Sequence, residues 1–277
     1  MKLEGLFNRR REDGTSGEHP RYVFVVTYGR SGSTLTQGLL NTLPGSLVRG
    51  ENNMFMLPFF RSWAGLKEFQ EKNNENARKG SQSAFYGLDE IDPEDFVQTA
   101  RELTLRSLYG SADPSGVEVL GFKEVLWHRI KREEQAAFFD WFEQIFPGAT
   151  YVLNQRDHEK VSTSGFWQNQ EERRVLRTLK RVEEMQQFLR DSRPGRTHDI
   201  RYERVTSDDA DVKARELRGL AEFVVGSCDD SLLAKLHATL DKGHGPRPFG
   251  RSRGQAEGED EGESSSGSPV TAADASE

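Results

Sequence analysis

Residues 22–35 read Tyr-Val-Phe-Val-Val-Thr-Tyr-Gly-Arg-Ser-Gly-Ser-Thr-Leu. An apolar, partly β-branched run ends at a loop with two glycines and one arginine, and a helical pattern of leucines follows. A strand, a glycine-containing loop and a helix in this order present backbone N–H groups and a helix N-terminus to an anion. Arg30 adds a positive charge, and Ser31, Ser33 and Thr34 add hydroxyl groups. The alternative is an ordinary turn with a capping Ser or Thr.

The loop differs from that of nucleotide triphosphatases, which requires G-x-x-x-x-G-K-[ST]. Here the glycines are Gly29 and Gly32, and the basic residue precedes the second one. Residues 29–35 instead resemble the 5′-phosphosulfate loop of sulfotransferases that use 3′-phosphoadenosine 5′-phosphosulfate (PAPS), although Gly29 stands where many members have Pro. The resemblance implies that PAPS is bound by six consecutive residues: Arg30, Ser31, Gly32, Ser33, Thr34 and Leu35. It also implies a catalytic role for Arg30 beside the bond that breaks.

A second phosphate motif begins at the end of the strand expected at 150–154. Arg156 and Ser164 are eight residues apart, and a guanidinium fork with a hydroxyl suits one phosphate group. The alternative is an arginine paired with Asp157 or Glu159. The segment resembles the 3′-phosphate motif of sulfotransferases, R-D-x-x-x-x-x-x-S, with His158 where the family often has Pro. The resemblance implies that Arg156 and Ser164 bind the 3′-phosphate of PAPS.

Two further residues match catalytic positions of the same family. Glu51 follows the first helix, where many sulfotransferases have the base that deprotonates the acceptor hydroxyl. Lys123 lies in a G-x-K-[ED] segment at a strand end, where related enzymes have a lysine near the transferring sulfuryl group. The alternatives are a capping or merely exposed glutamate, and a salt bridge of Lys123 with Glu124 or a neighbour.

A basic segment near the C-terminus resembles the loop that covers the 3′-phosphate in heparan-type sulfotransferases. It spans 249–255, and the resemblance implies donor contacts from Arg251, Arg253 and Gly254. A basic linker before an acidic tail is the alternative interpretation.

Strand and helix patterns alternate along the chain, which predicts a single α/β domain with a central, mostly parallel sheet flanked by helices. Strands are expected near 21–28, 117–122, 150–154 and 198–202, and helices near 34–43, 93–109, 133–146, 158–190, 211–225 and 229–240. Residues 73–87 are expected to form a mobile excursion. The resemblance implies a P-loop NTPase-like sulfotransferase fold. Because ligands bind beyond the carboxyl ends of parallel strands, Arg30, Lys123 and Arg156 are expected on one rim.

The net charge of −7 is concentrated at the C-terminus. Residues 255–277 carry seven acidic side chains and no Lys or Arg, which leaves the rest neutral and gives no case for nucleic-acid binding. We expect a flexible leader at 1–20, a sulfotransferase domain at 21–254 and a disordered acidic tail at 255–277. Without a membrane span, a signal sequence or a second cysteine beside Cys228, we expect a cytoplasmic location. The six histidines are scattered, so no metal site is expected.

These features predict transfer of a sulfuryl group from PAPS to a hydroxyl of a small-molecule or carbohydrate acceptor. A sulfuryl group carries less charge than a phosphoryl group, so no metal clamp is required. One alternative is a P-loop-type small-molecule kinase, which needs a lysine after Gly32 and a metal-binding Asp at a strand end. The other is a non-catalytic nucleotide-binding protein of the same fold. The sequence leaves the acceptor and the oligomeric state open.

Overall fold

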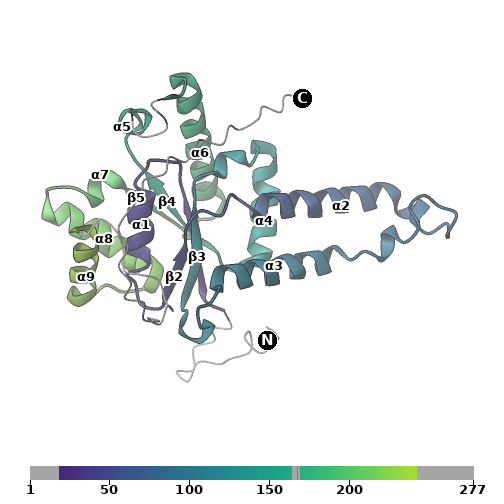
Figure 1. Ribbon diagram of the computed structural model, residues 1–277, viewed down its shortest axis with the longest axis horizontal. Coiled ribbons are helices and arrows are strands. Elements are labelled where there is room, and N and C mark those ends of the chain that lie inside the picture. The colour runs from purple at the N-terminus through teal and green to yellow at the C-terminus, as the bar shows by residue number, and fades with distance from the viewer. Residues whose placement is uncertain (1–18, 164–166, 168, 242–277) are drawn as a thin grey trace, which may run out of the picture.

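The computed structural model of the chain describes residues 19–163, 167 and 169–241 (Figure 1). Within them lies one five-stranded sheet, in the order β2-β3-β1-β4-β5. Its strands are β1 (Arg21–Val26), β2 (Ser46–Arg49), β3 (Val119–Glu124), β4 (Thr150–Gln155) and β5 (Thr197–Arg201). All four strand pairings are parallel. The predicted α/β class is therefore confirmed.

Helices cover both faces of this sheet, as Figure 1 shows. They are α1 (Ser33–Leu40), α2 (Met56–Ala77), α3 (Pro93–Tyr109), α4 (Gln135–Ile145), α5 (His158–Ser162), α6 (Glu172–Ser192), α7 (Tyr202–Val205), α8 (Ala210–Val225) and α9 (Asp230–Asp241). Short 3-10 turns occupy Leu88–Glu90, Pro114–Gly116, Trp127–Arg129 and Arg132–Glu134. Buried residues of α2, α3, α4 and α6 pack on one face, and those of α1, α8 and α9 pack on the other.

Side chains of β1 alternate between the two hydrophobic clusters that lie on opposite faces of the sheet. Tyr22, Phe24 and Val26 belong to the larger, aromatic cluster, whereas Val23 and Val25 belong to the smaller aliphatic one. This is the period of two that a strand imposes when both faces are covered. Buried on both sides, β1 fixes the position of the loop that follows it.

The helix boundaries differ from the expectation in two places. A single helix, α2, occupies Met56–Ala77 and ends inside the excursion expected at 73–87. Its first turns pack Met56, Leu57 and Phe60 into the core, and no glycine or proline interrupts the polar half before Gly80. The helical stretch expected at 158–190 is two helices, α5 and α6. Figure 1 shows α2 and α3 running together away from the sheet.

Strand β2 was not expected from the sequence. It has only four residues, and Gly45 and Gly50 flank it, so its apolar pattern is too short to recognise. The acidic tail lies outside the described residues, as does the leader up to residue 18, and the domain limits stay a prediction. None of the described helices is long and apolar enough to cross a membrane.

Candidate active site

The four charged residues singled out in the sequence lie at one edge of the sheet. Glu51 follows β2, Lys123 is the penultimate residue of β3, Arg30 follows β1 and Arg156 follows β4. These strands are neighbours in the order β2-β3-β1-β4 and run in parallel, so their carboxyl ends meet. Strand β1 lies between β3 and β4, so the chain continues to one side of β1 and then to the other. The carboxyl end of β1 is therefore a topological switch point, where ligands bind in α/β sheets.

The loop after β1 enters α1 through left-handed backbone. Arg30 has φ 66° and Gly32 has φ 78°. Gly32 is the N-cap residue of α1, and no side chain caps the helix, so the ordinary Ser- or Thr-capped turn is not what the structure shows. The N–H groups of Ser33 and Thr34 open the helix and have no intrahelical partner. They are therefore left for an anion at the positive end of the helix dipole.

Asn154 of β4 holds this loop in place through side-chain hydrogen bonds. Its side-chain nitrogen donates to the Ser31 carbonyl at 3.1 Å, and its side-chain oxygen accepts from the Thr36 hydroxyl. The Thr27 hydroxyl donates to the Asn154 carbonyl at 3.0 Å. Ser31 Oγ is fully buried and lies 2.7 Å from Thr27 Oγ1, so this hydroxyl serves the internal network. Trp167 Nε1 also donates to the loop, to the Gly29 carbonyl at 3.0 Å.

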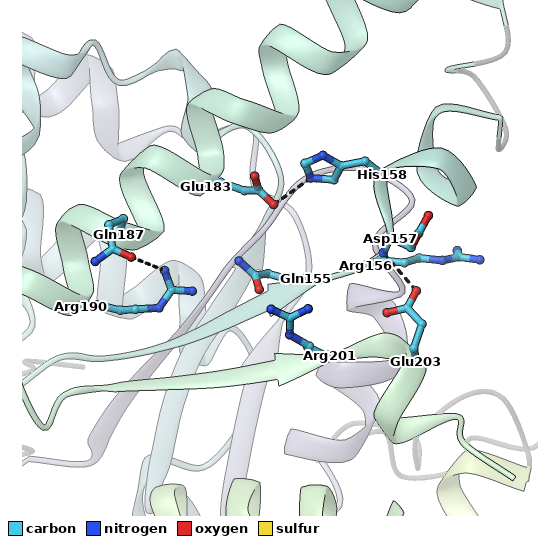
Figure 2. Close-up of a pocket in the computed structure, with 9 residues that line it drawn as sticks. All are labelled: Gln155, Arg156, Asp157, His158, Glu183, Gln187, Arg190, Arg201 and Glu203. Carbon is cyan, nitrogen blue, oxygen red and sulfur yellow. Dashed lines mark hydrogen bonds and ion pairs between the residues drawn. The ribbon is translucent and has the colours of Figure 1, made fainter. Parts of the chain in front are cut away.

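Arg156 reaches back to the same loop. Its Nη1 donates to the Arg30 carbonyl at 3.0 Å, and its guanidinium carbon lies 4.3 Å from the centre of the Tyr202 ring. Its Nε is buried and has no hydrogen-bond partner among the described residues. Among the described residues, Arg156 forms no salt bridge with Asp157 or Glu159, which was the alternative interpretation. Asp157 instead accepts from the Lys160 N–H at 3.1 Å and caps α5. Arg156 is one of the residues that line the pocket drawn in Figure 2, together with Gln187 and Arg190.

Tyr28 holds the backbone of Arg156 in place. Its hydroxyl donates to the Arg156 carbonyl at 2.8 Å and accepts from the Arg156 N–H at 3.0 Å. Burial raises the pKa of Tyr28 to about 12, so the hydroxyl keeps its proton and both bonds at neutral pH.

On the other side of the loop, Lys123 pairs with Glu51. The ammonium of Lys123 lies 2.5 Å from Glu51 Oε1, and only 6% of the Lys123 side chain is exposed, against 50% for Glu51. Glu51 is therefore neither a helix cap nor an isolated surface glutamate. The two groups proposed for proton transfer and charge stabilisation form one ion pair at the rim.

Glu124 fixes the loop that carries Glu51. Its buried carboxylate accepts four backbone N–H groups: from Asn52 at 3.1 Å and Met54 at 2.9 Å on one oxygen, and from Val125 at 2.7 Å and Leu126 at 3.1 Å on the other. Lys123 therefore forms no salt bridge with Glu124, but the alternative of a salt bridge with another neighbour is confirmed, since Lys123 pairs with Glu51. Asn53 and Met54 both have positive φ, a conformation that these bonds hold.

Four predicted donor contacts lie outside the described residues. They are Ser164, Arg251, Arg253 and Gly254. No group of three or more His, Cys, Asp or Glu side chains suited to a metal occurs in the part of the chain that the structure describes.

The comparisons with known proteins bear on this geometry. A model of the sulfotransferase family matches residues 20–223, which include the whole sheet and all four rim residues. The chain belongs to the sulfotransferase family. No curated protein matched the chain. Membership of this family supports sulfuryl transfer. It disfavours the kinase alternative, as does Ser33, which stands where the phosphate loop of a P-loop kinase has lysine.

Sequence reasoning on this sulfotransferase missed how closely Tyr202 contacts the loop. A Cβ built on Gly32 would lie 2.1 Å from Tyr202 Cδ2, so the ring packs directly on the glycine and also carries Arg156. No local signal reveals this contact, because 170 residues separate the two positions. The role of Asn154 in holding the loop had a weak sequence signal, because it is a polar residue in a mostly apolar strand.

We expect Gly32→Ala to disrupt this contact and to destabilise the fold by about 2–4 kcal/mol, since strain at positive φ adds to the clash. Gly80→Ala is the matched control, because Gly80 also has positive φ (87°) but no atom within 4 Å of its Cβ position. Thermal unfolding of both variants measures the difference. Equal losses would show that the Tyr202 contact does not restrict residue 32.

Proposed function

We propose that this sulfotransferase takes its sulfuryl group from PAPS and transfers it to an acceptor hydroxyl. The observation that carries the proposal is the contact between Arg156 and the Arg30 carbonyl. It brings together a helix N-terminus and an arginine fork, two groups that can each bind a phosphate. A donor with a 5′-phosphosulfate and a 3′-phosphate requires such a pair of sites, and ordinary nucleoside triphosphates do not carry the second group.

The residues present fit this donor. The buried Nε of Arg156 lacks a partner among the described residues, which favours a ligand oxygen in its place. Gly32 provides the left-handed backbone that leads into α1, and the helix offers its first N–H groups. We assign the 5′-phosphosulfate to residues 30–35 and the 3′-phosphate to Arg156, with Ser164, Arg251, Arg253 and Gly254 as further proposed contacts.

The proposed chemistry needs one base and a set of positive groups. Glu51 accepts the proton of the acceptor hydroxyl as its oxygen forms a bond to sulfur. The bond from sulfur to the bridging oxygen of the phosphate breaks in line with this attack. Lys123, Arg30 and the N–H groups of the loop stabilise the negative charge that passes to that oxygen. PAPS supplies the activated sulfuryl group and leaves as 3′-phosphoadenosine 5′-phosphate (PAP).

The ion pair between Glu51 and Lys123 supports a division of roles. The carboxylate and the ammonium form a direct ion pair. When Lys123 turns to the bridging oxygen, Glu51 is released toward the acceptor. The base is then free only when the donor is in place.

Binding of PAP tests the donor assignment directly. We expect PAP to raise the melting temperature of the full chain, because a ligand at 100 times its dissociation constant adds about 2.7 kcal/mol to stability. ATP should raise it less, since it has no 3′-phosphate for Arg156. Arg156→Ala should weaken PAP binding by about tenfold or more and abolish the preference over ATP.

The control is Arg204→Ala, which removes a nearby exposed arginine. Among the described residues, its one ion pair is with Glu216 and spans 3.8 Å. It should leave PAP binding unchanged. A larger shift with ATP than with PAP, or equal effects of the two arginine substitutions, would contradict the donor assignment.

A further inference from the structure

A second pocket adjoins the loop that carries Glu51. It has a volume of about 910 Å³, which is within the range of small-molecule sites. Asn53 and Met54, the second and third residues after Glu51, form part of its wall. The first turns of α2, the segment 128–135 and α6 complete it. We call it the basic pocket, because five of its lining side chains are basic: Arg61, Arg129, Lys131, Arg132 and Arg181.

The positive charge of this pocket is compensated only in part: its five basic side chains face the carboxylates of Glu133, Glu134 and Glu184, which leaves an excess of two. Only two acidic residues line it, Glu133 and Glu184, and neither forms a salt bridge with another described residue. Arg61 is neutralised by Glu134, with bonds of 3.0 and 2.8 Å. The remaining arginines and Lys131 have no ion pair within the described part of the chain. The excess is local, because the chain without its acidic C-terminal residues is neutral.

The pocket is also rigid where it meets the catalytic loop. Arg129 Nη1 donates to Asn53 Oδ1 at 3.0 Å, and Arg61 Nη2 donates to the Arg129 carbonyl at 3.2 Å. Glu134 accepts from Arg61 and from the backbone N–H of Lys131. The hydrogen bond from Arg61 holds the pKa of Glu134 below its usual range, so this carboxylate stays charged. Arg61 and Arg129 are thereby held in place beside the loop that carries Glu51, which reduces the entropy that these two side chains lose on binding.

The basic pocket is separate from the surface assigned to the donor. Its walls follow β2 and β3, whereas Arg30 and Arg156 follow β1 and β4. Helix α6 lies between the two pockets: Arg181 and Glu184 line the basic pocket, while Glu183 and Gln187 line the pocket at Arg156. An anion in the basic pocket is therefore not the 3′-phosphate of the donor.

We propose that the basic pocket binds an anionic group of the acceptor, a carboxylate or a phosphate or sulfate ester, and that this group directs the acceptor hydroxyl toward Glu51. The inference rests on the proposed function and adds the class of substrate. Arginine forks bind carboxylate and phosphate oxygens in pairs, and Arg181 of α6 and Lys131 of the segment 128–135 both supply donors to the pocket. An alcohol without a negative charge leaves these donors unpaired and binds more weakly.

Equilibrium dialysis with glucose 6-phosphate and glucose tests this charge preference without requiring turnover. The full chain is first saturated with PAP, so that the phosphate ester cannot occupy the donor surface. We expect the protein to retain glucose 6-phosphate and not glucose. Arg181→Ala should weaken retention about tenfold, and Arg181→Lys should weaken it less. Arg177→Ala, an exposed arginine one turn earlier on α6, is the control that should change nothing.

The activity arm uses labelled PAPS and a set of alcohols, each in a neutral and an anion-bearing form. We expect labelled products from the anion-bearing forms, with a KM that rises about tenfold in Arg181→Ala at unchanged kcat. No retention of glucose 6-phosphate, or equal retention by Arg181→Ala, overturns the inference while PAP binding leaves the proposed function intact. Products confined to neutral alcohols overturn it as well. Loss of PAP binding in the wild-type chain instead overturns the proposed function.

Discussion

Replacing Glu51 by Gln is expected to lower the turnover of sulfuryl transfer about 100- to 10,000-fold while leaving PAP affinity unchanged. The amide has nearly the shape of the carboxylate but cannot accept the proton of the acceptor hydroxyl. Its position beside Lys123, after β2 rather than after β1 or β4, keeps it away from the phosphates assigned to Arg30 and Arg156. Single-turnover measurements with labelled PAPS, together with PAP titrations, separate the two effects.

The same substitution removes the counter-charge of a nearly buried ammonium. Only 6% of the Lys123 side chain is exposed, and Glu51 is its salt-bridge partner. Losing one member of such a pair destabilises a protein, so the melting temperature must be measured beside the activity. The double variant Glu51→Gln, Lys123→Met removes both charges and should recover stability without recovering turnover. Recovery of both would mean that Glu51 serves the fold and not the proton transfer.

Glu102→Gln is the control for this experiment, since Glu102 is exposed on α3 and outside the rim. It should change neither turnover nor melting temperature. A Glu51→Gln protein that transfers sulfuryl groups at more than about a tenth of the wild-type rate would contradict the assignment of Glu51 as the base.

The parts of this site that sequence predicted are those that depend on local order. The loop at 29–35 and the strand end at Arg156 are each set by a hydrophobic run that stops, and the parallel order then brings them to one edge. The Glu51–Lys123 contact was not predictable in the same way. It depends on β2, a four-residue strand whose pairing with β3 places residues 72 positions apart side by side.

Contacts of long sequence separation account for the other omissions. Tyr202 meets Gly32 and Arg156 only because α7 begins where β5 ends. The basic pocket combines α2, α6 and the turns at 127–134, three segments that no motif links. In each case the residue types were visible in the sequence, but the tertiary packing that selects their partners was not.

The second large effect is expected at Glu124, which contacts no reacting atom and acts as a positioning residue. Replacing it by Ala leaves four backbone N–H groups at a fully buried position without their acceptor. Each unsatisfied buried donor costs about 1–3 kcal/mol, partly offset by water and relaxation, so we expect a loss of about 4 kcal/mol. For a chain of this size, thermal unfolding should show a decrease of about 8–16 °C in the melting temperature.

Glu124→Gln separates positioning from stability. One oxygen of Glu124 accepts from Asn52 and Met54, and the other accepts from Val125 and Leu126. An amide has one acceptor and one donor end, so in either orientation its NH₂ group faces two N–H donors. Asn53 and Met54, with φ of 59° and 54°, then lose part of the force that holds them in this conformation, and Glu51 loses its place beside Lys123.

We therefore expect Glu124→Gln, assayed well below its melting temperature, to lower kcat for sulfuryl transfer at least tenfold while leaving the KM for PAPS unchanged, because the donor surface at β1 and β4 does not depend on this loop. A purely structural role for Glu124 predicts the opposite pattern, in which the folded fraction retains full kcat. Normal kcat in a folded Glu124→Gln protein would separate the loop from the chemistry. It would then remove the physical link between the buried carboxylate and the base that it is proposed to hold.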